Sequence, residues 1–283
     1  MDFGMFDFED RVIPLDDWIQ SFVDWLVLHF RDWFQMLKWP VDATLGSLDG
    51  FLNWLHPLAV IVLFVVLAWR VSGWRLSLFS AFTLVFIGLL GLWEDTMTTL
   101  AMVLSSVIFC ALAGIPLGIV SGRSDGFERF LRPFLDAMQT TPAFVYLVPV
   151  VMLFSIGTVA GVLATIVFAM PPIIRLTSLG IRQVDSELVE AAVAFGATPW
   201  QVLRRVQLPL ARPTILAGLN QTIMMSLSMV VIAALIGAGG LGLPVFQGLN
   251  TLNIGLAAIG GLAIVLMAMV LDRITQAMGT KTD

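Results

Sequence analysis

Charged residues are scarce in this chain of 283 residues. Asp, Glu, Lys and Arg together make up 12% of it, about half of their usual share in soluble domains. Hydrophobic residues make up 58%, which is more than a soluble core of this length needs. The composition therefore excludes a soluble enzyme, a disordered chain and a nucleic-acid-binding protein. It indicates a membrane protein, and the length allows several spans of about 20 residues each.

Residues that bind metals or carry out catalysis are equally scarce. The single cysteine, Cys110, allows no intrachain disulfide and no cysteine metal cluster. The two histidines, His29 and His56, are isolated from each other, and we interpret both as interfacial residues. The sequence also lacks a GxxxxGK[ST] phosphate-binding loop. We therefore expect no catalytic residue, no metal site and no cofactor in this chain.

The N-terminal region, residues 1–53, is acidic. Its first ten residues carry four acids where a secretory signal peptide would carry basic residues, so we do not interpret it as a signal peptide. Within it, residues 14–39 place apolar side chains at i, i+3, i+4 and i+7, which predicts an amphipathic helix. Charges recur too often there for a membrane span. We expect this helix to lie at the membrane interface, or to pack against the transmembrane bundle.

Seven apolar segments follow, which predicts an all-α polytopic membrane protein. Residues 54–93 would supply two accessory transmembrane helices, and residues 94–275 a core of five helices. Residues 276–283 would form a C-terminal tail. The expected spans are 54–70, 75–93, 98–120, 134–155, 158–179, 213–236 and 254–271.

The distribution of basic residues predicts the orientation in the membrane. With the C-terminus in the cytoplasm, the outer loops between spans hold no Lys or Arg, and the inner side holds twelve of the 15. Cytoplasmic loops are enriched in these residues, so we expect an outside N-terminus and a cytoplasmic C-terminus. The twelve are Arg70, Arg75, Arg123, Arg129, Arg132, Arg175, Arg182, Arg204, Arg205, Arg212, Arg273 and Lys281.

The cytoplasmic loop at 180–212 is expected to form two short helices. Asp185 can cap the first helix, because its carboxylate can accept a hydrogen bond from a free backbone N–H group. Gly196 supplies a left-handed stop at the end of that helix. Thr198 is a good cap for the second helix and Pro199 suits its first position.

The second short helix is expected to end at Arg204 and Arg205, because cations are favoured at a helix C-terminus. Pro209 and Pro213 then lead into the next span. A compact helix–turn–helix of this kind can dock into a groove of another protein. The spacing alone also fits a soluble connector between two spans.

Several residues of this loop resemble the EAA signature of ABC importer permeases. The pattern runs from Glu190-Ala191-Ala192 through Gly196 to Val206-x-Leu208-Pro209, with Val206 where isoleucine is common. The resemblance covers about residues 94–275 and implies the permease core of a type I ABC importer. It also implies that the loop is seated on a separate ATPase subunit. The residues implied in ATPase coupling are Glu190, Ala191, Ala192, Gly196, Leu208 and Pro209.

Polar residues inside spans mark a candidate substrate path, because they are costly in a bilayer. They gather in the fourth and sixth spans, and their alternative role is hydrogen bonding between helices. The fifth span carries Pro171-Pro172, which we expect to kink or break it. The candidate path residues are Gln139, Thr140, Thr141, Tyr146, Asn220, Gln221, Ser226 and Ser228.

Three stretches resemble the glycine betaine, proline betaine and choline branch of these permeases. They are QTTPAFVYLVPVVMLF, FAMPPIIRLTSLGIRQV and IGAGGLGLPVFQGLN. The resemblance implies a multi-pass protein of the bacterial inner membrane that works as a homodimer. Its implied partners are two ATPase subunits, which bind ATP and Mg²⁺, and an external substrate-binding protein. That binding protein would hold the quaternary ammonium group by cation–π contacts.

The cargo stays open between betaine, choline and another small organic ion such as carnitine. A secondary transporter or a channel is a more remote alternative. Either would favour inverted repeats or ionisable residues inside the spans, and the sequence shows neither.

Overall fold

The computed structural model describes residues 14–280, and the fold below concerns that range. It contains helices and no strand, which confirms the all-α class. The four acids expected to exclude a signal peptide lie outside the described residues.

The helices follow one another with short connections. In chain order they are α1 (Leu15–Trp54), α2 (Pro57–Ser72), α3 (Trp74–Leu89), α4 (Trp93–Arg123), α5 (Asp125–Thr140), η1 (Ala143–Tyr146), α6 (Leu147–Phe154), α7 (Thr158–Arg182), α8 (Ser186–Ala194), α9 (Pro199–Val202), η2 (Leu203–Gln207), α10 (Leu208–Ala233), η3 (Ala234–Ile236), α11 (Gly242–Asn250) and α12 (Ile254–Thr280). Most are α-helices; η1 and η3 are 3₁₀ turns and η2 is a π turn.

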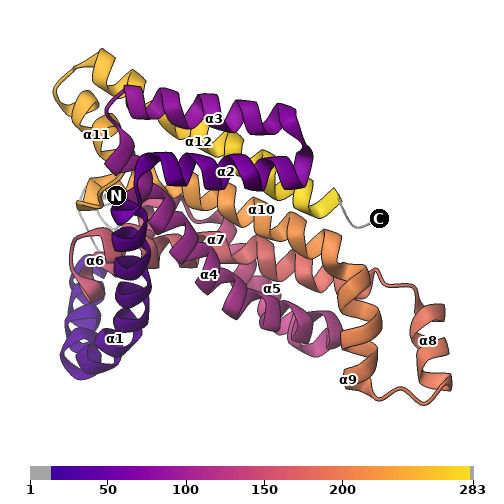
Figure 1. Cartoon of the computed structure of the whole chain (residues 1–283). Coiled ribbons are helices and arrows are strands. Elements are labelled where there is room, and N and C mark those ends of the chain that lie inside the picture. The colour runs from indigo at the N-terminus through magenta and orange to yellow at the C-terminus, as the bar shows by residue number, and fades with distance from the viewer. Residues whose placement is uncertain (1–13, 281–283) are drawn as a thin grey trace, which may run out of the picture.

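Four long helices form the bundle. Figure 1 shows α4, α7, α10 and α12 running side by side, with α7 between α4 and α10. The hairpin of α2 and α3 packs against α12. Each long helix is apolar enough and long enough to cross a membrane, as expected for the core of a multi-pass protein.

The number of spans differs from the seven that the sequence predicts. Four helices meet the length and composition of a span, or up to six if each of two bent pairs counts as one. The expected span 134–155 is not one continuous helix, because α5 and the segment Ala143–Phe154 are bent by 107° at the break that follows Thr140. Pro142 causes this break: it has no N–H to donate, and it favours an extended Thr141, whose ψ is 126°.

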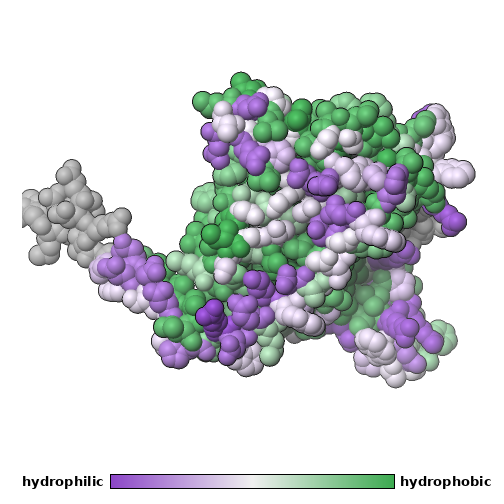
Figure 2. Space-filling view, turned by 60° about the vertical axis from the view of Figure 1, so that its left-hand side comes forward, coloured by the Kyte–Doolittle hydropathy of each residue, from purple (hydrophilic) through white to green (hydrophobic). Residues whose placement is uncertain are grey.

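The N-terminal amphipathic helix is longer than the 14–39 segment that the pattern predicts. It runs without interruption past Pro40 to Trp54. Its C-terminal half buries Val41, Leu45 and Leu52 against the bundle, and this packing offsets the hydrogen bond lost at Pro40. Figure 2 shows hydrophilic residues along the arm where α1 leaves the grey N-terminus.

Three glycines let α4 and α7 approach closely. Gly114, Gly118 and Gly122 lie one turn apart on α4, and a Cβ at Gly118 would come within 2.5 Å of Cβ of Thr177. Small residues at this spacing are typical of helix pairs packed inside membranes. The proline pair Pro171-Pro172 is buried in α7, which stays continuous. The expected break is therefore absent.

We expect Gly118→Val to destabilise the protein by about 1–3 kcal/mol or more, because the new side chain overlaps α7. Gly261→Val in α12 is the matched control, since a Cβ there has no neighbour within 4 Å. The measurement is the thermal unfolding temperature of each purified variant in detergent. Equal unfolding temperatures for the two variants would contradict the packing argument.

Candidate functional site

The loop at 180–212 folds as a hairpin of two short helices. The Asp185 carboxylate accepts a hydrogen bond from the Glu187 backbone N–H at 2.9 Å, which caps α8 as expected. The helix ends where Gly196 adopts a left-handed conformation, with φ at +83°. Two reverse hydrogen bonds close this end: Gly196 N–H donates to Val193 O, and Ala197 N–H donates to Ala192 O.

The second half of the hairpin begins with a reciprocal cap. The Thr198 backbone N–H donates to Gln201 Oε1 at 2.8 Å, and the Gln201 N–H donates to Thr198 Oγ1 at 3.4 Å. Pro199 occupies the first helical position, as expected. The expected end at Arg204 and Arg205 is wrong. The chain continues through the π turn η2 into α10, so α9 to η3 form one uninterrupted run of helical turns, Pro199–Ile236.

The π turn has a local cause. Pro209 lacks the N–H group that would bond the carbonyl four residues earlier. Just before it, the Leu208 N–H donates to Leu203 O, five residues back, so the helix widens and continues. Pro209 lies at the start of α10 and leads into the next span, as expected.

The hairpin presents apolar side chains to solvent. Figure 1 shows α8 and α9 standing away from the bundle, and α8 buries none of its residues. Phe195 is 93% exposed, Trp200 is 64% exposed and Val193 is 57% exposed. The sequence reasoning missed these side chains, because it relied on the spacing of small residues.

The motif residues divide between the tip and the base of the hairpin. Glu190, Ala191 and Gly196 are exposed near the tip, and Ala192 is half-buried. Leu208 lies at the base, where it packs against a cluster of Ile181, Leu203 and Ala211, while Pro209 is exposed. The cluster joins the ends of α7 and α10. A displacement of the hairpin would therefore be transmitted to both helices.

The candidate path residues of the fourth expected span lie around the bend between α5 and α6. The Thr140 and Thr141 hydroxyls both donate to Ala137 O, at 3.2 and 2.8 Å. The Tyr146 hydroxyl donates to Met138 O at 2.5 Å across the bend. The Tyr146 bond satisfies the Met138 carbonyl, whose partner four residues later, Pro142, has no N–H. Ala137 O also accepts the Thr141 backbone N–H, so the two threonine hydroxyls add to a bond that the helix end already makes. Gln139 is exposed beside them.

The candidate path residues on α10 lie in different surroundings. Gln221 and Ser228 are exposed, whereas Ser226 is buried and donates to Thr222 O. The Asn220 amide donates to Asp272 of α12 at 2.9 Å, and its carbonyl oxygen accepts from the Thr275 hydroxyl. Asn220 therefore joins two helices, which is the alternative role that the sequence left open.

Ion pairs connect α5 to α7 at the end of the bundle from which the hairpin extends. Arg182 contacts Asp125 at 2.6 Å and Glu128 at 2.8 Å, and Arg175 pairs with Asp136. A cavity of about 460 Å³ lies between these two helices. Because Arg182 ends α7 only three residues before the Asp185 cap of α8, the pairs fix the helix that carries the hairpin.

Comparison with known proteins agrees with this architecture. The family described as "Binding-protein-dependent transport system inner membrane component" matches residues 114–282, which include the hairpin, α10 and α12. This chain belongs to that family. It is a transport permease of ABC importers and a multi-pass inner-membrane protein.

Two curated relatives match the permease over nearly its whole length. The glycine betaine/proline betaine transport system permease protein ProW of Escherichia coli (strain K12) is 52% identical over 272 residues, covering 96% of this chain and 77% of that protein. The glycine betaine/carnitine transport permease protein GbuB of Listeria monocytogenes (serotype 1/2a, strain 10403S) is 45% identical over 277 residues, covering 95% of this chain and 96% of that protein.

A solved structure shows the same fold. The permease matches a chain of the MetNI methionine ABC transporter, described as inward-facing, with a TM-score of 0.60 and 24% sequence identity. The match covers 65% of this chain and 93% of that chain. About a third of the permease thus has no counterpart in that structure.

Proposed function

We propose that this permease is the membrane-spanning subunit of an importer for quaternary ammonium compounds such as glycine betaine, proline betaine or choline. The observation that carries the proposal is the 52% identity with the E. coli glycine betaine/proline betaine permease, over 96% of this chain. Such a cargo has no net charge or a single positive charge, so it needs polar walls rather than a buried counter-charge. The exposed Gln139, Gln221 and Ser228 could supply such walls.

The hairpin would receive the driving force from a separate ATPase. Its apolar tip carries Phe195 and Trp200, and an exposed apolar surface of this kind favours a protein partner. ATP and Mg²⁺ would bind in that partner, since this sequence has no phosphate-binding loop. We therefore assign no catalytic residue, metal site or cofactor to the permease itself.

The working assembly would be two copies of this permease, two ATPase subunits and an external substrate-binding protein. ATP binding would draw the ATPase subunits together and move both hairpins as rigid bodies. The cluster at the hairpin base would pass that movement to α7 and α10, which would turn the path from one side of the membrane to the other. Hydrolysis would reset the cycle. In this arrangement the N-terminus lies outside and the C-terminus lies in the cytoplasm.

Reconstitution tests this function directly. We expect proteoliposomes holding the permease and its ATPase to accumulate radiolabelled glycine betaine when ATP is inside and the binding protein is outside. Uptake should fall to background when any one of these components is left out. Uptake of a structurally unrelated amino acid but not of any quaternary ammonium compound would overturn the proposed cargo.

Carnitine is the second candidate cargo. The glycine betaine/carnitine relative from Listeria monocytogenes, at 45% identity, favours it. Carnitine also carries a quaternary ammonium group and a carboxylate, so the same path could pass it. Competition between unlabelled carnitine and labelled glycine betaine in the same proteoliposomes separates the two cargoes.

A further inference from the structure

A cavity of about 560 Å³ lies between α3 and α12, where the accessory hairpin, formed by α2 and α3, meets the core. It is distant in sequence from the coupling hairpin, formed by α8 and α9, and none of the candidate path residues lines it. Arg75 lines it from α3 and Arg273 lines it from α12, together with the polar side chains of Ser72 and Gln276. Neither ATPase coupling nor the substrate path therefore gives this cavity a role.

The two arginines have no acidic partner within residues 14–280. Neither takes part in a salt bridge, and the only ring contact of Arg75 places its guanidinium 5.8 Å from the Trp74 ring centroid. Asp272 is the only acidic residue on the helices α2, α3, α10 and α12. Its Oδ1 atom already accepts from Asn220 at 2.9 Å and from Gln276 at 2.6 Å. Within residues 14–280, therefore, no acidic side chain pairs with the positive charge that lines the cavity, and this charge can attract an anion.

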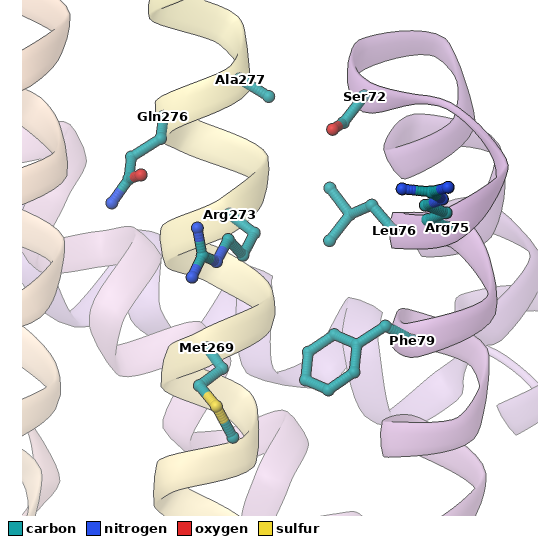
Figure 3. A pocket seen from close by; sticks show the side chains of 8 residues that line it. All are labelled: Ser72, Arg75, Leu76, Phe79, Met269, Arg273, Gln276 and Ala277. Atoms are coloured by element: carbon teal, nitrogen blue, oxygen red, sulfur yellow. The ribbon is translucent and has the colours of Figure 1, made fainter.

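The cavity is polar at one end and apolar at the other. Because α3 and α12 run antiparallel, Phe79 lies one turn below Arg75 while Met269 lies one turn below Arg273. Figure 3 shows Leu76 and Phe79 pointing from α3 toward α12, with Arg273 near the level of Leu76 and Met269 near that of Phe79. A ligand that fills this space needs an anionic head and an apolar tail.

Two tryptophans indicate that the polar end of the cavity lies at the membrane surface. Trp69 and Trp74 flank the turn between α2 and α3, with 65% and 64% of their surfaces exposed. Tryptophan is enriched at the level of lipid headgroups. Further along α3, Leu78 and Phe82 are 61% and 66% exposed, as expected for a surface that faces acyl chains. The charged end of the cavity thus lies where phosphate groups of a bilayer lie.

We propose that this cavity binds an anionic phospholipid, with its phosphate between Arg75 and Arg273 and an acyl chain over Phe79 and Met269. Basic pockets between transmembrane helices on the cytoplasmic side are a known way to hold such headgroups. The bound lipid would join the accessory hairpin to the core. The proposal does not depend on which solute the permease transports.

Native mass spectrometry of the purified full chain tests the proposal. We expect retention of phosphatidylglycerol or cardiolipin but not of phosphatidylcholine. Each basic side chain near an anionic lipid surface adds to the binding free energy. We therefore expect the double variant Arg75→Gln/Arg273→Gln to bind phosphatidylglycerol about thirtyfold more weakly. The matched control is Arg123→Gln/Arg129→Gln, which removes the same charge from exposed residues of α4 and α5 and should retain the lipid.

Two further arms keep the test decisive. Arg75→Lys/Arg273→Lys keeps the charge and should retain most of the lipid, even if the glutamine variant proves unstable. Inorganic phosphate at millimolar concentration should not raise the unfolding temperature, because it cannot use the apolar end. Equal lipid retention by the glutamine variant and its control would overturn the proposal. Stabilisation by inorganic phosphate equal to that by phosphatidylglycerol would also overturn it, in favour of a free-anion site.

Discussion

Replacing Gly196 by valine should reduce ATP-driven uptake at least tenfold while the amount of permease in the membrane stays unchanged. Gly196 has a φ of +83°, a conformation that a β-branched residue adopts only with strain. The cost of about 1–2 kcal/mol corresponds to roughly a tenfold loss of the hairpin conformation that fits the ATPase. The position is open, since a Cβ there has no neighbour within 4 Å. The bundle itself should therefore fold normally.

Two further variants separate backbone strain at the hairpin from strain in general. Gly91 also has a left-handed φ, at +74°, and equally open surroundings, but it lies in the turn between α3 and α4. Gly91→Val should therefore leave the coupling intact. Gly196→Asn should restore part of the uptake, because asparagine tolerates this conformation better than valine. The hypothesis fails if Gly196→Val transports as fast as the unmodified permease.

Replacing both Phe195 and Trp200 by aspartate should prevent the permease from recovering its ATPase during affinity purification. These side chains are 93% and 64% exposed, so their loss costs the isolated permease little. Aromatic residues at the centre of an interface commonly contribute 2 kcal/mol or more each. A charge in their place would be desolvated on docking, which adds to the penalty. We expect the affinity for the ATPase to fall by at least about thirtyfold.

The control for this experiment is Ile254→Asp. Ile254 is also an exposed apolar residue, at 83%, but it begins α12, outside the hairpin. An aspartate there is favourable at a helix N-terminus, so the fold should tolerate it. The assembly hypothesis is wrong if the ATPase is recovered equally with both variants.

The coupling hairpin shows which structural features can be predicted from residues that are neighbours in the sequence. Asp185, Gly196 and Thr198 take the caps and the left-handed stop that their residue types favour, because each depends on hydrogen bonds within a few residues. The same rules failed at Arg204, because a cation is favourable at a helix end but does not create one. The π turn before Pro209 carries the chain on into α10.

The remaining differences depend on tertiary packing. Pro171 is buried inside the continuous helix α7, and Pro40, although exposed, is followed in α1 by residues buried against the bundle, whereas Pro142 follows a break. The pairing of Asn220 with Asp272 joins residues 52 positions apart, and no periodicity within one helix indicates it. The assignments of the coupling and path residues stay predictions that the variants above can test.

Simultaneous measurement of ATP hydrolysis and glycine betaine uptake by the reconstituted complex tests the central claim most directly. If the permease couples to a separate ATPase through its hairpin, uptake stops when the ATPase subunit is omitted, whatever ion gradient is imposed. In Gly196→Val the account predicts hydrolysis that continues while uptake falls at least tenfold. Accumulation driven by a sodium or proton gradient without the ATPase would contradict the account and indicate a secondary transporter.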